Sequence, residues 1–260
     1  MKLTKCAMAL LLSAALSLVL RGLGPIVGGD STAHVYTEMI LRQLIIWGLP
    51  CILMGGTMHH RKLWEIAPVN CAAAVLMGVC AQYLLPMITE ASQRVLGTEP
   101  AVLPMPSGTL EWVLGVLALV IVPAVTEELF FRAGLQQAML LNGGGMPEIG
   151  LAALIFAGAH TSLTGLTAYM AVGVLLGLTL ASTWSIVPCM LLHASYNAMA
   201  LVWTLWPVAR NWLGVVVSLA LLAALIVRAW RYRCFREAEE RWPQWPLLAA
   251  GCVAIVARIL

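Results

Sequence analysis

Long apolar segments recur along the whole of this 260-residue chain, and they constrain its fold more than any other feature. Hydrophobic residues make up 61% of the sequence and charged residues only 10%, a balance that a water-soluble domain of this length does not normally show. We therefore expect an integral membrane protein. Because the apolar segments approach the length of membrane-spanning helices and lack alternating polarity, the fold class is predicted to be all-α rather than a β-barrel.

The apolar segments predict a polytopic protein of about eight transmembrane helices, folded as a single integral membrane domain over residues 1–260. For the first segment, a retained helix is favoured over a cleaved signal peptide because no clear small-residue cleavage site follows it. The predicted helices lie near residues 6–21, 40–58, 67–88, 109–141, 148–161, 165–182, 184–206 and 211–229, and a short ninth helix at 246–260 is left open.

Basic residues predict the orientation in the membrane. If the N-terminus is cytoplasmic and eight helices alternate, most of the lysines and arginines between helices fall on the cytoplasmic side, which is the distribution expected for inner-membrane proteins. Arg21 and Arg42 lie on or near the opposite side. The formal charge of +3 is too small and too dispersed to indicate a nucleic-acid partner. The basic residues expected on the cytoplasmic side are Lys2, Lys5, Arg61, Lys62, Arg231, Arg233, Arg236 and Arg241.

Three charged residues, Glu127, Glu128 and Arg132, stand inside a segment that otherwise reads as a membrane helix. A charged side chain near the bilayer centre costs roughly 2.5 to 3.5 kcal/mol on insertion scales, so the three need partners or a use. Glu128 and Arg132 are four residues apart and share a helix face, which predicts an ion pair. Glu127 is left over for chemistry and is expected to face the membrane histidines; the alternative is a purely structural network.

Three further polar residues occur in later apolar segments. His160 ends the run IGLAALIFAGAH, and a packing role for a lone membrane histidine is an equal alternative to a catalytic one. His193 and Asn197 stand four residues apart in HASYN, so they project from one helix face. Helical rise places Glu127, His160 and His193 at a similar depth in the membrane. Together these residues predict a polar site within the bilayer.

The three motifs resemble those of a known family. EELFFR fits an EExxxR pattern, FAGAH an FxxxH pattern and HASYN an HxxxN pattern, in that order and on separate predicted helices. This set is similar to the CAAX prenyl protease and bacteriocin-processing family of intramembrane endopeptidases, also called the Abi family. Each pattern alone is weak, but three in order are specific. The resemblance covers about residues 109–200, which we take as the core that carries the protease motifs.

The resemblance implies peptide-bond hydrolysis by a water molecule held inside the membrane. By this similarity Glu127 is the general base and His160 helps to hold the water. His193 and Asn197 correspond to the groups that stabilise the oxyanion, while Glu128 and Arg132 occupy the remaining motif positions. The implied partners are a peptide or protein substrate, either prenylated or otherwise membrane-anchored, and the lipid bilayer.

Whether a metal ion takes part is a separate question. Glu127, His160 and His193 could in principle supply three zinc ligands, but no HExxH motif is present and Asn197 suits an oxyanion donor better than a zinc ligand. We therefore expect a metal-free mechanism without a cofactor. The alternative to an enzyme is a non-catalytic membrane scaffold or an immunity-type binding protein that keeps the polar network for helix packing.

Overall fold

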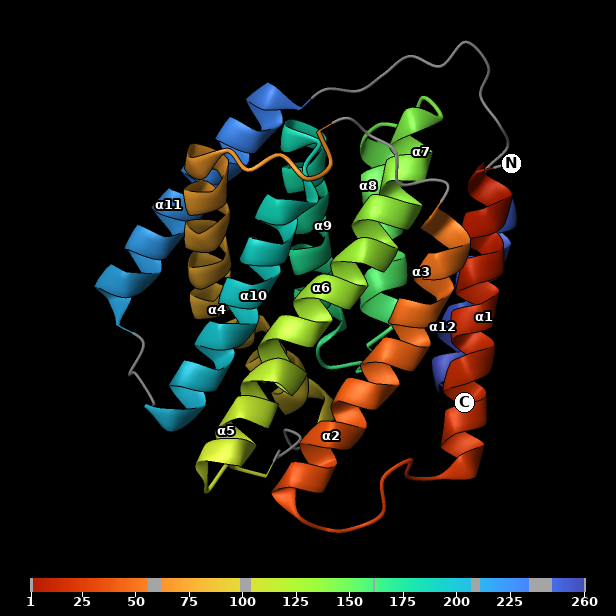
Figure 1. The fold of residues 1–260 in the computed structure, drawn as a ribbon. Coiled ribbons are helices and arrows are strands. Elements are labelled where there is room, and N and C mark those ends of the chain that lie inside the picture. The colour runs from red at the N-terminus through yellow and green to blue at the C-terminus, as the bar shows by residue number, and fades with distance from the viewer. Residues whose placement is uncertain are drawn as a thin grey trace.

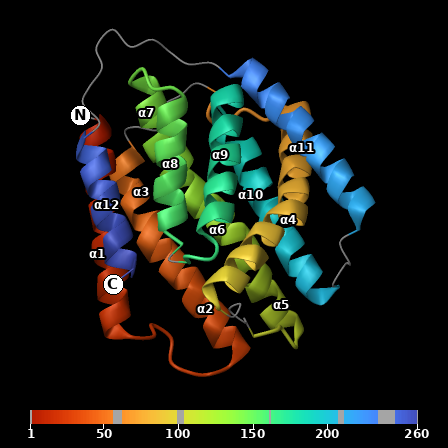
Figure 2. The same ribbon diagram turned by 180° about the vertical axis from the view of Figure 1, so that it is seen from behind.

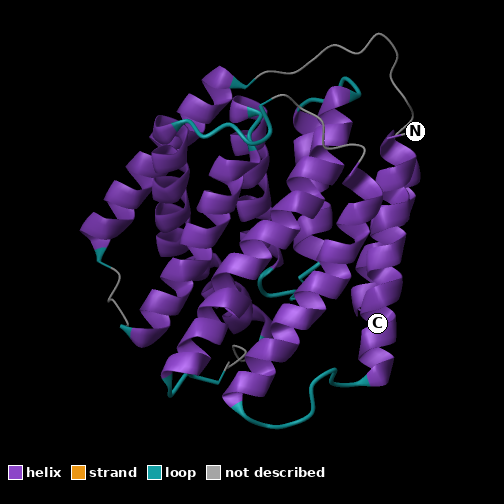
Figure 3. Ribbon diagram, viewed as in Figure 1, coloured by secondary structure: helices purple, strands orange, loops and turns teal. Residues whose placement is uncertain are grey.

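The computed structural model describes residues 2–55, 62–98, 104–160, 162–206, 211–233 and 245–259. All regular structure in these residues is helical, as Figure 3 shows. The α-helices are α1 Lys2–Leu23, α2 Thr32–Gln43, α3 Leu49–Met54, α4 Pro68–Leu96, α5 Thr109–Val116, α6 Val122–Glu128, α7 Gln137–Leu141, α8 Met146–Gly158, α9 Leu166–Thr183, α10 Ile186–Leu205, α11 Trp212–Tyr232 and α12 Trp245–Ile259. Three π-helical segments join some of them, namely η1 Leu44–Gly48, η3 Leu117–Ile121 and η4 Leu129–Gln136.

Within the described residues, seven helices are long and apolar enough to cross a membrane. The prediction of an all-helical, polytopic membrane protein is therefore confirmed. The segment predicted at 148–161 differs from a full span, because α8 has only 13 residues and a spanning helix needs about 20. A helix is also present at the ninth predicted segment, where α12 has 15 residues.

Two of the membrane-crossing helices contain a π-helical segment just before a proline. Proline lacks the N–H that bonds the carbonyl four residues earlier, and its ring clashes with that carbonyl. For Pro50 the carbonyl belongs to Ile46 in η1, and for Pro123 it belongs to Leu119 in η3. The wider π-helical turns thus lie where the backbone has to accommodate each proline, and the chain continues as one helix across the membrane.

The helices form a bundle around the long helix that runs from α5 to α7 (Figure 1). The α2–α3 helix lies beside it, and α1 and α12 pair at one edge of the bundle, as the view from behind also shows (Figure 2). At the opposite edge α4 packs against α10 and α11, and between the two edges α9 packs against α8. The η4 segment lies inside this bundle, so that every residue from Phe130 to Gln136 is buried.

Small residues allow α8 and α9 to approach closely. A Cβ atom at Gly173 in α9 would lie 2.9 Å from the Cα atom of Ala153 in α8, a distance that real Cβ atoms essentially never show. Close backbone approach at small residues is a common basis of helix association in membranes, where the lipid gives no hydrophobic drive between helices. The contact matters for the polar interior, because the Gly173 carbonyl accepts a hydrogen bond from Arg132.

We expect Gly173→Ala to lower the thermal stability of the purified protein, because the added methyl group forces α8 and α9 apart. Gly150→Ala is the matched control: a Cβ there meets no atom within 4 Å, and alanine in an open helical position is favoured over glycine by about 1 kcal/mol. Thermal unfolding in detergent should therefore show a lower midpoint for Gly173→Ala only. Equal midpoints for the two variants would contradict the close-packing explanation.

Candidate active site

The first part of the site is a buried ion pair. Glu128, the last residue of α6, places Oε2 3.4 Å from Nε of Arg132 in η4, and both side chains are fully buried. The Arg132 guanidinium also donates from Nη2 to the Gly173 carbonyl at 3.3 Å and lies 4.5 Å from the centroid of the Phe156 ring. The predicted ion pair between Glu128 and Arg132 is confirmed, even though the backbone between them is π-helical and not α-helical.

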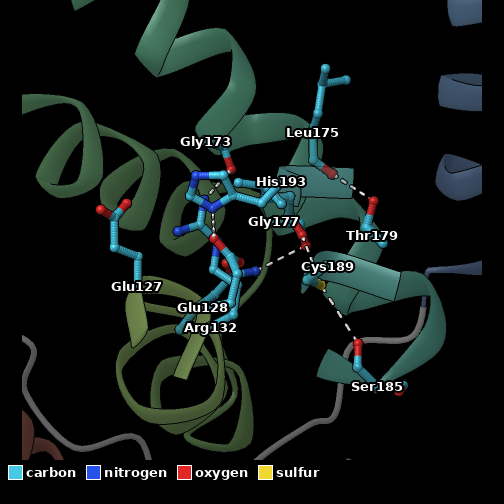
Figure 4. Close-up of polar contacts among 12 residues, drawn as sticks. Glu127, Glu128, Arg132, Gly173, Leu175, Gly177, Thr179, Ser185, Cys189 and His193 are labelled. Carbon is cyan, nitrogen blue, oxygen red and sulfur yellow. Dashed lines mark hydrogen bonds and ion pairs between the residues drawn. The ribbon is translucent and has the colours of Figure 1, made fainter. Parts of the chain in front are cut away.

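His193 joins this ion pair from another helix. Its Nδ1 atom lies 2.9 Å from Oε1 of Glu128, and both side chains are buried. Because a carboxylate can only accept, Nδ1 carries a proton in this contact. Figure 4 shows Glu128, Arg132 and His193 gathered between the η4 segment and α10. Glu128 therefore bridges a cation on its own helix and a histidine on α10.

Glu127 belongs to a second group, and Figure 4 shows its carboxylate directed away from the Glu128 cluster. Its Oε2 atom lies 3.7 Å from Nε2 of His160 and has no hydrogen-bond partner among the described residues. Its Oε1 atom accepts a hydrogen bond of 2.8 Å from Nε2 of Gln43 in α2. Glu127 is thus held on one oxygen and faces His160 with the other.

His160 lies in the turn that follows α8, and its ring is fixed on two sides. Nδ1 is 2.8 Å from the carbonyl oxygen of Phe156, one helical turn earlier. Since a carbonyl only accepts, Nδ1 is the protonated nitrogen, and a neutral ring then presents an acceptor at Nε2. The ring also stacks on Tyr169 of α9, with centroids 4.2 Å apart. These contacts aim Nε2 at Glu127.

The two groups meet at Phe156. Its ring centroid lies 4.6 Å from that of His160 and 6.0 Å from that of His193, so one aromatic side chain contacts both histidines. The expectation that Glu127 would face both histidines is therefore corrected: Glu127 faces His160, and His193 pairs with Glu128. The physical reason is that His193 lies close to the carboxylate that also pairs with Arg132.

Asn197 lies one helical turn beyond His193 on α10, as the spacing predicts, and is partly buried. Within the described part of the chain, its side chain makes no hydrogen bond. The structure thus places five of the six predicted site residues in the helices of the bundle and His160 in the turn that follows α8. Five of them are joined by side-chain contacts, namely Glu127 with His160, and Glu128 with Arg132 and His193.

Two site neighbours, Gln43 and Tyr169, are absent from the motifs. Gln43 is a polar residue in the apolar stretch LRQLIIWGLP, which is a weak signal that does not indicate a partner 84 positions away. Tyr169 is the fourth residue of α9, in a segment that reads as ordinary membrane helix. Contacts between distant helices fix both positions, and no local pattern encodes them.

The described residues do not offer a ready zinc site. Catalytic zinc needs three protein ligands within about 2.0 to 2.3 Å of one point. No group of three or more His, Cys, Asp or Glu side chains in the described ranges is placed to hold a metal ion. In the alternative set, Glu127 contacts His160, whereas His193 contacts Glu128 through Nδ1.

We expect Arg132→Met to destabilise the protein by about 3 to 5 kcal/mol, because it leaves the Glu128 carboxylate buried without its arginine. The double variant Glu128→Gln/Arg132→Met removes both charges and should be more stable than Arg132→Met alone. Free energies of unfolding in detergent, measured by denaturant titration, give the comparison. If the double variant is as unstable as Arg132→Met alone, the loss of stability does not come from an uncompensated Glu128 charge.

Comparison with known proteins agrees with the motifs. Residues 109–199 match the family model described as Rce1-like, type II CAAX prenyl endopeptidase Rce1-like, and this segment contains all six site residues. Comparisons with curated proteins and with solved structures found no match. The resemblance to the CAAX prenyl protease family is thus confirmed for residues 109–199, and this segment of the membrane protein is similar to CAAX-type endopeptidases.

Proposed function

We propose that this protein is an intramembrane endopeptidase that hydrolyses a peptide bond with a water molecule activated by Glu127 and His160. The observation that carries the proposal is the 3.7 Å separation between Glu127 Oε2 and His160 Nε2. Both atoms are acceptors when the histidine is neutral, and Oε2 has no hydrogen-bond partner among the described residues. One water molecule can donate a hydrogen bond to each of these two atoms.

In the proposed reaction, Glu127 takes a proton from this water as the water oxygen attacks the carbonyl carbon of the substrate. The carbonyl π bond opens and its electrons go to the oxygen, which becomes the oxyanion of a tetrahedral intermediate. Glu127 then returns the proton to the nitrogen of the leaving amine, and the C–N bond breaks. The side chain of His160 is 23% exposed and that of Glu127 only 5%, so we infer that substrate approaches from the His160 side.

His193 and Asn197 are the proposed donors to the oxyanion. Nδ1 of His193 is directed at Glu128, so a donor role falls to Nε2 and requires a ring protonated at both nitrogens. The Glu128 carboxylate supplies the counter-charge for that cation. The Asn197 amide, one turn further along α10, makes no hydrogen bond with other described residues. A preorganised donor of this kind is worth about 2.7 to 4 kcal/mol to the transition state.

The proposed substrate is a hydrophobic, lipid-anchored or leader-type peptide. The family description names prenyl endopeptidases, which supports a membrane-anchored peptide. We further propose an inner-membrane location with a cytoplasmic N-terminus. The start of α1, the segment before α4 and the end of α11 lie at one end of the bundle, and these carry many of the lysines and arginines (Figure 1).

A metal-independent mechanism is part of the proposal. It is supported by the positions of the described His, Cys, Asp and Glu side chains, no three of which are grouped so as to hold a metal ion. A non-catalytic scaffold is the competing function, because the cluster of Glu128, Arg132 and His193 could serve helix packing alone. Such a scaffold has no need of the second carboxylate, Glu127, whose Oε2 atom is left without a hydrogen bond among the described residues.

We expect Glu127→Gln to abolish hydrolysis while the protein remains folded, because an amide of the same size cannot take the proton of the water. Cleavage of a fluorogenic farnesylated CAAX-type peptide and of its unprenylated counterpart, by protein in proteoliposomes, measures the loss. Glu90→Gln, the same change at an exposed position on α4, should keep wild-type activity. Full activity of Glu127→Gln would overturn the assignment of the base.

We expect hydrolysis to survive treatment with the chelator 1,10-phenanthroline, because no step of the proposed mechanism uses a metal ion. The rate of peptide cleavage before and after chelation, followed by addition of zinc, tests this. Loss of activity on chelation and recovery with zinc would replace the metal-free mechanism by a zinc-dependent one, while the assignment as an endopeptidase would stand.

A further inference from the structure

The contact between Gln43 and Glu127 joins the candidate base to a helix outside the segment that matches the family. Gln43 is the last residue of α2, whereas the matched segment begins at residue 109. Its Nε2 atom donates to Glu127 Oε1 at 2.8 Å. We propose that Gln43 is a positioning residue that sets the orientation of the Glu127 carboxylate; this inference rests on the proposed function of Glu127.

The orientation of the Gln43 amide follows from its partner. A carboxylate has only acceptors, so the amide must present its NH₂ group to Glu127 and turn its oxygen away. Flipping the amide would set two acceptor oxygens against each other. The Gln43 Oε1 atom is buried and has no hydrogen-bond partner in the described ranges, so its own contacts do not decide which way the amide faces. The hydrogen bond to Glu127 therefore determines which way the amide faces.

The hydrogen bond from Gln43 restricts the orientation of the Glu127 carboxylate, which the side-chain torsion of the glutamate does not restrict. The terminal torsion of a glutamate is broad, so an unrestrained carboxylate samples many orientations. With Oε1 held by Gln43, Oε2 is the oxygen that lies 3.7 Å from His160 Nε2. The two acceptors that would hold the water are therefore fixed relative to each other before substrate arrives. Preorganisation of this kind affects the rate of the chemical step more than substrate binding.

An aromatic contact on the same helix fixes the position of Gln43. Trp47 follows it by four residues and packs on the motif helix, with its ring centroid 4.9 Å from that of Phe130 and 4.8 Å from that of Phe131. The aromatic contact and the amide contact thus lie about one turn apart on both helices. Together they hold the α2–η1 helix against the α6–η4 helix, so Gln43 cannot drift from Glu127 without disturbing a packed aromatic cluster.

Gln43→Met tests the inference, since methionine keeps the length of the side chain and removes its donor. Gln136→Met is the matched control: Gln136 also donates one buried hydrogen bond through Nε2, to the Gly177 carbonyl at 2.9 Å, and its Oε1 is also unpartnered in the described residues. We expect Gln43→Met to lower kcat for the farnesylated peptide about 10- to 100-fold with little change in KM. Gln136→Met should retain the wild-type kcat.

Infrared spectroscopy supplies a second measurement that needs no activity. The carboxylate band that disappears in Glu127→Gln belongs to Glu127, and its frequency should shift in Gln43→Met but not in Gln136→Met. Equal kcat values for the two methionine variants, or an unshifted band in Gln43→Met, would overturn the positioning role. If the wild-type protein cleaves no peptide, the proposed function fails, and the infrared band alone then decides whether Gln43 orients Glu127.

Discussion

The buried ion pair between Glu128 and Arg132 is the interaction on which the interior of this protein depends. Neither charge is stable alone in a membrane bundle, because desolvation of a single buried ion costs several kcal/mol. The pair also has partners on two other helices, namely the Gly173 carbonyl on α9 and His193 on α10. The contacts that satisfy these charges therefore also fix how three helices pack together. The second carboxylate, Glu127, is not needed in this cluster and contacts His160 instead.

Much of the fold follows directly from the sequence. Membrane helices satisfy their own backbone hydrogen bonds, so apolar length located most helix ends within a few residues. Two ends differ more: α2 begins at Thr32, eight residues before the predicted start, and α4 ends at Leu96, eight residues beyond the predicted end. What could not be anticipated is where a helix widens. The π-helical segments near Pro50 and Pro123 follow from proline chemistry in retrospect, but η4 has no proline and depends on the packing of its fully buried residues. Short helices such as α8 were equally hard to distinguish from spans.

The candidate site was predicted in part, for a similar reason. Spacing of four residues along one helix indicated the Glu128 and Arg132 pair, and the pairing is present. Partnerships between helices were not indicated by spacing. His193 pairs with Glu128 and not with Glu127 because the choice depends on how α10 is rotated against α6, a quantity that only the packed bundle determines. Gln43 was missed for the same cause, since its partner lies on a helix 84 positions away.

The hydrogen bond between His160 and the carbonyl of Phe156 has a consequence for variation of the sequence. Its acceptor belongs to the backbone, so every amino acid at position 156 provides it as long as α8 keeps its last turn. The choice of which imidazole nitrogen carries the proton is therefore insulated from point mutation and is encoded by helical geometry. A substitution that unravels the end of α8 would change which nitrogen of His160 carries the proton, even if no polar side chain is replaced. The last turn of α8 is therefore itself a determinant of the protonation pattern of His160.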